Sequence, residues 1–119
     1  MYRIISVSRN VHRLLERSNV LAMAGFSVMS PRPEEASILA ALQQVDAVVI
    51  GHSVEASLRQ NIISDLRQFC PQCLICFVYA APETAGEPLA DVSLDVTSGP
   101  ESLIVALQER LPRAFQEAS

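Results

Sequence analysis

The stretch Asp46-Ala47-Val48-Val49-Ile50-Gly51-His52-Ser53 decides how this chain folds. Its residues 47–50 are small or apolar, with β-branched side chains among them, which predicts a strand covered on both faces at the centre of a parallel sheet. Gly51 ends that strand. In open α/β sheets the functional crevice lies beyond the carboxyl ends of the central strands. Gly51, His52 and Ser53 are therefore the first candidates for a functional site.

The composition predicts one globular domain that binds neither nucleic acid nor an anionic membrane. The chain has 119 residues, half of them hydrophobic, which is enough to bury a single core. Its 9 basic residues against 13 acidic ones give a net charge of −4, so neither nucleic acid nor an anionic membrane is an expected partner. All the basic residues are arginine, which excludes chemistry based on lysine.

The first residues predict the location of the protein. Met1-Tyr2-Arg3-Ile4-Ile5 lacks the apolar run of a signal peptide, and no run of about 18 apolar residues exists to span a bilayer. We therefore expect a cytoplasmic protein.

Strand and helix patterns alternate along the chain. Strands are expected at residues 4–8, 26–29, 46–51, 73–79 and 92–96, and helices follow Asn10, Glu34, Glu55 and Ser98. The alternation predicts an α/β fold, a three-layer αβα sandwich of flavodoxin-like type with five parallel strands in the order 2-1-3-4-5. The first and last helices should share one face. The domain should cover residues 1–112, with a polar C-terminal tail at 113–119.

The segment between Tyr79 and Leu89 breaks the alternation. It contains two prolines and one glycine and has no apolar period, so a fourth helix should be shortened or absent.

Apolar residues at helical spacing predict the buried face of each helix, and Arg59 should point away from the core. The expected core positions are Val11, Leu14, Leu15, Leu21 and Ala22; Ala36, Ile38, Leu39, Leu42 and Val45; Leu58, Ile62, Leu66 and Phe69; and Leu103, Ile104, Leu107 and Leu111.

The three cysteines of Cys70-Pro71-Gln72-Cys73-Leu74-Ile75-Cys76 have a spacing that zinc and iron–sulfur sites also use. An offset of three residues on one strand, however, puts the side chains of Cys73 and Cys76 on opposite faces. We therefore expect buried or loop thiols with no metal, no cofactor and no disulfide.

His52 and Ser53 could carry chemistry at the end of the central strand. His52 would serve as a base or a phosphate acceptor, or it simply lines a loop, since no carboxylate lies close in sequence to orient it. Ser53 lacks the glycine two residues later that a nucleophile elbow needs. None of the glycines forms a phosphate-binding loop, so no enzyme is predicted.

Over residues 3–111 the chain resembles the receiver domain of bacterial response regulators. The best matching lines are Asp46-Ala47-Val48-Val49-Ile50-Gly51, like the Asp-Leu-Val-Leu-Leu-Asp of the third strand, and Leu89-Ala90-Asp91, like the Gly-Ala-Asp before the fifth. The resemblance places the phosphoacceptor position at Gly51 and the Mg²⁺-binding acidic pair at Ser8 and Arg9. It places the switch hydroxyl near Phe77 or Val78 and the phosphate-pairing lysine at Val96.

None of these positions has the side chain that the phosphorelay needs. The leading hypothesis is therefore a degenerate receiver, or pseudo-receiver, that acts in signal transduction through protein contacts without phosphotransfer or Mg²⁺. The alternative is a small flavodoxin-like ligand-binding or enzymatic domain whose crevice is formed by Ser8, Arg9, Gly51, His52 and Ser53, with Arg9 binding an anion bidentately.

A contact surface is expected beside the irregular segment. Without a full helix there, the strand at Leu74–Tyr79 should be less covered, and exposed apolar area commonly marks an interface. We expect a homodimer or an unidentified protein partner on strands 4 and 5 and the last helix, with Leu89, Val92 and Leu94 contributing. Alternatively, the loop folds back and Pro82, Ala85 and Pro88 seal the gap.

Overall fold

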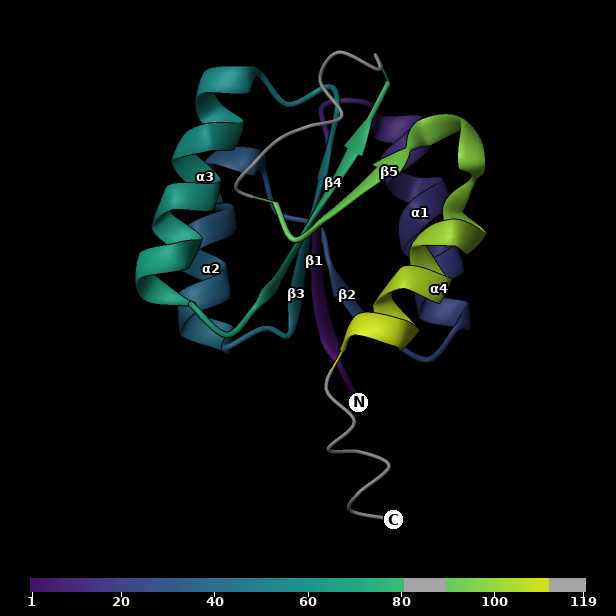
Figure 1. The fold of residues 1–119 in the computed structure, drawn as a ribbon, viewed down its shortest axis with the longest axis horizontal. Helices are drawn as coiled ribbons and strands as arrows, with labels where there is room; N and C mark the ends of the chain where they lie inside the picture. Colours follow the sequence, from purple (N-terminus) through teal and green to yellow (C-terminus); the bar gives the residue numbers. More distant parts are fainter. Residues whose placement is uncertain (81–89, 112–119) are drawn as a thin grey trace.

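The computed structural model describes residues 1–80 and 90–111, in which strands and helices alternate (Figure 1). The elements are β1 (Arg3–Val7), α1 (Val11–Met23), β2 (Ser27–Met29), the 3-10 turn η1 (Pro33–Glu35), α2 (Ala36–Gln43), β3 (Ala47–Gly51), α3 (Ala56–Phe69), β4 (Leu74–Tyr79), β5 (Val92–Asp95), the 3-10 turn η3 (Val96–Ser98) and α4 (Pro100–Arg110). None of the helices in these residues is long and apolar enough to cross a membrane.

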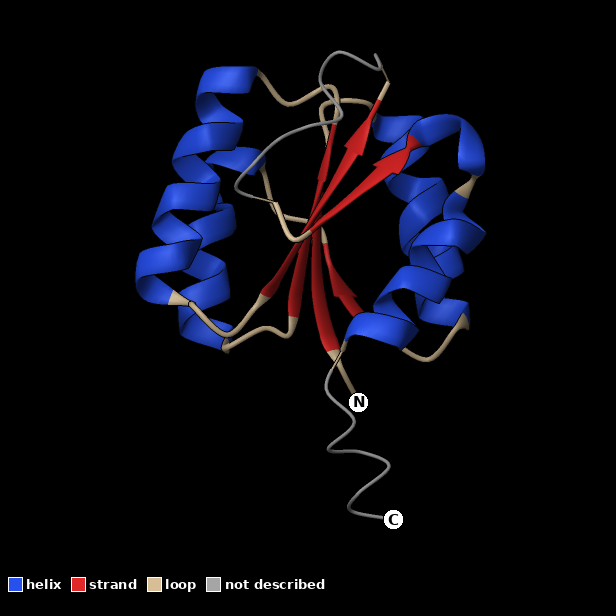
Figure 2. Cartoon of the chain, viewed as in Figure 1, coloured by secondary structure: helices blue, strands red, loops and turns tan. Residues whose placement is uncertain are grey.

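The five strands form one parallel sheet in the order β2-β1-β3-β4-β5, which confirms the predicted topology. Helices α2 and α3 cover one face, and α1 and α4 cover the other (Figures 1 and 2). The fold is therefore the three-layer sandwich that the alternating sequence indicates.

Strand β3 is the middle strand of the sheet, and all five of its residues are buried. Val49 pairs with Ser6 of β1 on one side and with Cys76 of β4 on the other. A strand with a neighbour on each side and a helix layer on each face favours apolar side chains throughout, which explains its continuous apolar run.

The alternating side chains of the strands feed two separate cores. The core under α2 and α3 includes Ile5, Val48 and Ile75, and the core under α1 and α4 includes Ile4, Val49 and Cys76. Residues one position apart thus contribute to opposite layers, as the period of a strand requires.

The helix ends agree in part with the sequence. The side chain of Asn10 caps α1 by accepting a hydrogen bond from the backbone N–H of Arg13, as expected. Gly25, at φ +98°, follows α1 in a conformation that favours glycine. Ser98 does not cap α4, because it lies in η3 and Gly99 occupies the cap position before Pro100.

The helix faces differ from the prediction at several positions. Six expected core residues are instead exposed, namely Val11, Leu15, Ala22, Ile38, Leu42 and Phe69. In their place two arginines are buried, Arg17 at 6% exposure and Arg59 at 8%. On α2 the small residues Ala36 and Ala40 are buried, while the larger Ile38 and Leu42 are exposed.

Strand β4 is better covered than the sequence suggested. Ile75, Cys76, Phe77 and Val78 are all buried, at 6% exposure or less, so the expected apolar gap on Leu74–Tyr79 is a wrong prediction. One cause is the guanidinium carbon of Arg59, which stacks 4.4 Å from the centre of the Phe77 ring. Several predictions fall outside the described residues. They concern the shortened or absent helix between Tyr79 and Leu89, the contact residue Leu89, the sealing residues Pro82, Ala85 and Pro88, and the tail at 113–119.

Candidate functional site

Ser8 and Gly51 meet at the carboxyl edge of the sheet, where β1 and β3 lie side by side. Val7 pairs with Ile50, so the residues that follow, Ser8 and Gly51, are adjacent. A Cβ atom added to Gly51 would lie 3.3 Å from Ser8 Oγ and 3.4 Å from the Val7 carbonyl oxygen. The space beside Gly51 is therefore already taken by Ser8.

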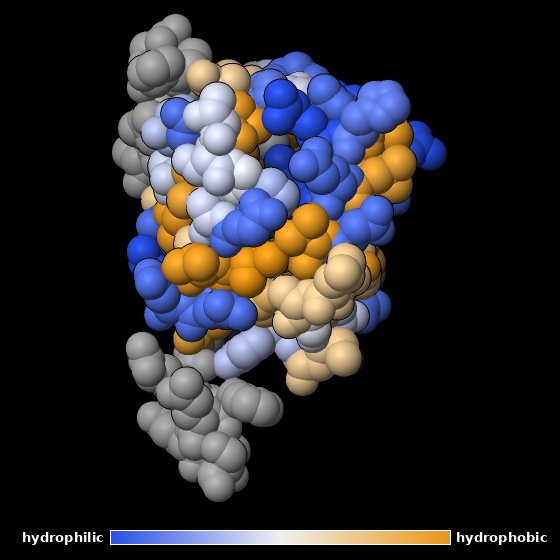
Figure 3. Space-filling model, turned by 90° about the vertical axis from the view of Figure 1, so that its right-hand side faces the viewer, coloured by the Kyte–Doolittle hydropathy of each residue, from blue (hydrophilic) through white to orange (hydrophobic). Residues whose placement is uncertain are grey.

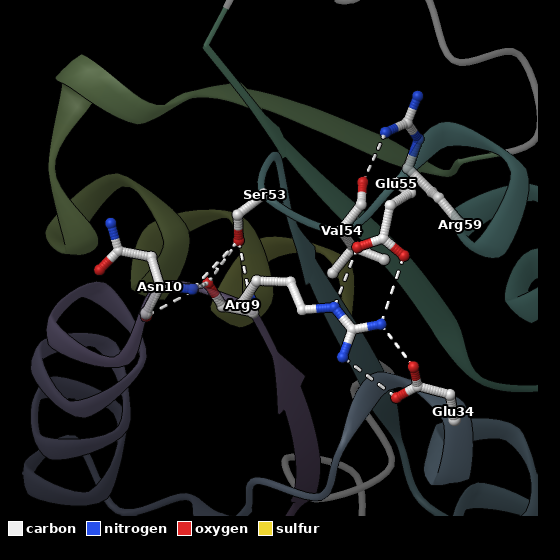
Figure 4. Close-up of polar contacts among 8 residues, drawn as sticks. Arg9, Asn10, Glu34, Ser53, Val54, Glu55 and Arg59 are labelled. Carbon is white, nitrogen blue, oxygen red and sulfur yellow. Dashed lines mark hydrogen bonds and ion pairs between the residues drawn. The ribbon is translucent and has the colours of Figure 1, made fainter.

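Two serine hydroxyls join the loop after β1 to the loop after β3. The Oγ atoms of Ser8 and Ser53 lie 2.9 Å apart, and the backbone N–H of Arg9 donates to Ser53 Oγ at 2.8 Å (Figure 4). The backbone N–H of Asn10 donates to Ser8 Oγ at 3.0 Å. Ser53, a candidate for chemistry, thus holds two loops together.

The side chain of Arg9 lies between two carboxylates. Its Nε donates to Glu55 Oε1 at 3.0 Å and its Nη1 donates to Glu34 Oε1 at 3.2 Å, while Nη2 contacts both acids (Figure 4). Both pairs are bidentate, the strong geometry for a guanidinium with carboxylates. We call these three residues the Arg9 cluster.

The Arg9 cluster stabilises the charged form of each of its members. Hydrogen bonds from Arg9 are the main cause that lowers the pKa of Glu34 and of Glu55, and the same bonds raise the pKa of Arg9. The side chains are partly exposed, at 36% for Arg9 and above half for both acids. Solvent screening therefore keeps the contribution of the cluster to folding small.

His52 lies in the turn after β3. Its Nε2 is buried and has no hydrogen-bond partner in the described part of the chain. Burial lowers the pKa of His52, and the positive charges of Arg13 and Arg17 on α1 lower it further. A His52 held neutral beside cations is a poor phosphate carrier, because no carboxylate orients it.

Val78 and Val96, which the resemblance matches to the switch residue and the lysine of a receiver, both contribute to a different part of the edge. Val78 pairs with Gly51 across β3 and β4, yet its side chain belongs to the core under α1 and α4. Val96 opens η3 directly after β5. Both line a cavity between α1 and α4 and give it no titratable group.

The cysteines are separated as the strand period predicted. Cys73 packs in the core under α2 and α3 and Cys76 in the opposite core, and burial raises the pKa of each thiol to about 12. Over residues 1–80 and 90–111 no three His, Cys, Asp or Glu side chains come together as a metal site would require.

Sequence reasoning placed Ser8, Arg9, Gly51, His52 and Ser53 at one edge, and the structure brings them there. It missed Glu34 and Glu55 as partners of Arg9. The strand order 2-1-3 was the available signal, because it puts the loop after β1 between the loops after β2 and β3, where Glu34 and Glu55 lie.

The sequence itself matches no protein-family model and no curated protein. Solved structures do match. The Vibrio cholerae chemotaxis protein CheY4 is 20% identical, with a TM-score of 0.79, over 93% of this chain and 99% of that one. A receiver domain from Methylobacillus flagellatus is 18% identical, with a TM-score of 0.79, over 92% and 98% of the two chains.

Not every similar structure is described as a response regulator. The CpaE protein of Burkholderia thailandensis, described as a putative pilus assembly protein, is 19% identical, with a TM-score of 0.73, over 92% of this chain and 97% of that one. At these identities the similarity defines the fold. The chain has the CheY-like receiver fold, as the resemblance in its sequence indicated.

Proposed function

We propose that this chain is a receiver-like signalling module that acts through protein contacts, accepts no phosphoryl group and binds no Mg²⁺ at its sheet edge. It is not an enzyme in this proposal, and it works in the cytoplasm. The observation that carries the proposal is the Arg9 cluster. A guanidinium, with both neighbouring carboxylates bound to it, occupies the place where the resemblance puts a metal-binding acidic pair.

The positive charge of Arg9 and the lack of free oxygen ligands both oppose binding of a divalent cation at the Arg9 cluster. The Arg9 guanidinium stays protonated at all accessible pH values and repels a second cation. All four carboxylate oxygens of Glu34 and Glu55 accept hydrogen bonds from Arg9, so a metal ion would have to displace it. Hard cations need several free oxygen ligands, and this edge offers hydroxyls that already bind backbone N–H groups.

Gly51 opposes phosphorylation by itself, because glycine has no oxygen to accept a phosphoryl group. A response regulator from Burkholderia pseudomallei with the same fold (20% identity, TM-score 0.77, over 100% of this chain and 74% of that one) was crystallised with a phosphorylated aspartic acid and a calcium ion. At the end of β3 the present chain has Gly51, with Ser8 Oγ filling the adjoining space.

The alternative function, a ligand-binding or enzymatic crevice with Arg9 as the anion-binding residue, loses support from the same contacts. Arg9 is bidentate as that hypothesis required, but its partners are the chain's own Glu34 and Glu55. An incoming anion would compete with two carboxylates held at the site.

For the protein contact we propose the surface of β5 and α4. β5 is an edge strand, and Val92 and Leu94 are half-buried against the core under α1 and α4. Val105 of α4 is half-exposed. An edge strand beside partly exposed apolar side chains is a surface that proteins commonly pair.

The test of metal and phosphoryl binding is an amide NMR titration with Mg²⁺, followed by Mg²⁺ with beryllofluoride. We expect no shift at residues 6–10 or 51–55, and the same result for Gly51→Asp, since the metal site would still be missing. A receiver domain with an intact acidic pair is the positive control. Saturable shifts at the edge of the wild-type protein would contradict the proposal.

The contact is tested by light scattering at about 100 μM, where an association of micromolar Kd is nearly complete. We expect a dimer, or a monomer that captures a partner through this surface, and loss of either in Leu94→Asp and Val105→Asp. Ile38→Asp, at an exposed position of α2, is the matched control. A monomer whose partner capture survives both substitutions would contradict the proposed surface.

A further inference from the structure

The cavity lined by Val78 and Val96 lies at the carboxyl edge, on the face opposite the Arg9 cluster. It has a volume of about 90 Å³ and is lined by α1, the ends of β4 and β5, and the start of α4, including Arg13, Arg17, Val78, Asp95 and Ser102. One water needs roughly 10–15 Å³ of such space, so the cavity can hold a polyatomic group. Figure 3 shows the α1 and α4 side, where hydrophilic residues gather above an apolar band.

Arg17 is the unusual residue in this cavity. Its side chain is buried, and within the described residues its one side-chain hydrogen bond is a long contact of 3.5 Å from Nη1 to Ser6 Oγ. Within the described parts of the chain no carboxylate lies within the 4.0 Å of an ion pair to it. A guanidinium has five N–H donors. Within the described residues most of those of Arg17 have no protein acceptor, and because they are not among the fully enclosed polar atoms, solvent in the cavity reaches them.

A buried cation without a counter-ion is costly, and proteins normally pair it with an acid or with bound ligand. Desolvation and the nearby charge of Arg13 both lower the pKa of Arg17. Arg13 is one helical turn earlier on the same face of α1 and lines the same cavity. Two guanidinium groups thus border one space.

Two acids, Glu16 and Asp95, also line the cavity and balance the formal charges of the two arginines, but among the described residues neither forms an ion pair with Arg17. Glu16 is exposed on α1, and its charge only partly offsets that of Arg13. Asp95 Oδ1 accepts hydrogen bonds from the backbone N–H and the hydroxyl of Thr97, at 2.8 and 2.7 Å. The start of α4, at Pro100 and Ser102, adds the positive end of an 11-residue helix.

From these observations we propose that the cavity is an anion site that holds one tetrahedral oxyanion, phosphate or sulfate or the phosphate group of a small metabolite, against Arg17 and Arg13. The forked guanidinium of Arg17 suits such a group because it can donate two parallel hydrogen bonds to it. The site is separate from the Arg9 cluster and gives this receiver-like domain an input that needs no covalent phosphorylation.

The test is a titration of the full chain with inorganic phosphate, with sulfate and with AMP, at constant ionic strength adjusted with chloride, followed by amide NMR and calorimetry. We expect saturable binding of millimolar affinity or tighter, with shifts at residues 13–17 and 94–102. Arg17→Met should weaken binding about tenfold or more, as expected for loss of a charge-assisted bidentate pair. Arg32→Met, at an exposed arginine outside the cavity, should leave it unchanged.

Arg13→Gln guards against a folding defect in the Arg17 variant, because Arg13 is exposed and its replacement should weaken binding several-fold without affecting the fold. Binding of AMP but not of inorganic phosphate would identify a nucleotide or metabolite as the source of the phosphate group. Binding of neither, or stabilisation by sulfate that is equal in wild type and Arg17→Met, would overturn the proposal.

Discussion

The two buried arginines, one on each face of the sheet, have opposite surroundings. Arg59 on α3 stacks over the ring of Phe77 at 4.4 Å and donates from Nη1 to the Val54 carbonyl oxygen at 3.3 Å. Arg17 on α1 has the single long contact to Ser6 and borders a cavity. Burial alone therefore does not distinguish the two residues, whereas the partners of each guanidinium do.

This difference separates a structural role from a binding role. Arg59 covers an aromatic ring and satisfies a backbone carbonyl, so its charge is compensated inside the fold. Among the described residues most donors of Arg17 have no protein acceptor, so water or a bound anion in the cavity has to satisfy them. The predictions below test this distinction, beginning with the largest expected effect.

Arg59→Ala should lower the free energy of unfolding by about 2–4 kcal/mol, because it uncovers Phe77 and removes a donor from the Val54 carbonyl. Urea denaturation followed by circular dichroism measures this change. A loss below about 0.5 kcal/mol would show that Arg59 is not the structural arginine that its contacts indicate.

Arg17→Met should leave the stability in the absence of phosphate unchanged or raise it by up to about 2 kcal/mol. Methionine keeps the apolar stem and removes a buried charge that lacks a counter-ion. The same denaturation experiment, in a buffer without phosphate or sulfate, decides the point. A loss comparable to that of Arg59→Ala would make Arg17 structural and remove the contrast.

Arg17→Met should also raise the pKa of His52, because the charge of Arg17 is one of the causes that lower it. In wild type the pKa of His52 is lower in the folded state than the unfolded value near 6.5. Its contribution to the free energy of unfolding is therefore fully present above pH 6.5 and is lost as the pH falls below that value. An NMR titration of the His52 ring measures the pKa. No upward shift in the variant would contradict the placement of the Arg17 charge near this ring.

Arg32→Ala provides the smallest expected effect. Its side chain is 83% exposed, and its one ion pair among the described residues is with the exposed Glu35, so the free energy of unfolding should change by less than about 0.5 kcal/mol. A larger loss would mean that exposed arginines also contribute to the free energy of unfolding. Arg32 could then not serve as the exposed reference for comparing Arg17 with Arg59.

The sequence predicted the sheet well because strand order follows from a simple pattern. Continuous apolar runs at Ala47–Gly51 and Leu74–Tyr79, separated by helices, leave few alternatives to the order 2-1-3-4-5. The helix faces were less predictable. Leu42 is 75% exposed while Arg17 is buried, and hydropathy cannot anticipate that a long aliphatic stem takes a core position.

The sequence predicted where the candidate site lies in the fold, but it did not predict which side chains contact one another there. The end of each strand put Ser8, Arg9 and Gly51 at one edge, since parallel strands end together. The partners Glu34 and Glu55 are 25 and 46 residues from Arg9 in the sequence. Whether their carboxylates contact Arg9 depends on the backbone conformation of η1 and of the loop after β3. The cavity beside Arg17 is lined from five elements, α1, β4, β5, η3 and α4, and no local sequence motif predicts it.

The most direct test of the central claim is an intact-mass measurement after incubation with acetyl phosphate and Mg²⁺. If Gly51 and the Arg9 cluster have replaced the phosphorelay chemistry, the wild-type chain will keep its mass, while a receiver domain with an acceptor aspartate gains one phosphoryl group in parallel. A stoichiometric phosphoryl adduct on the wild-type chain, at His52 or elsewhere, would contradict the account.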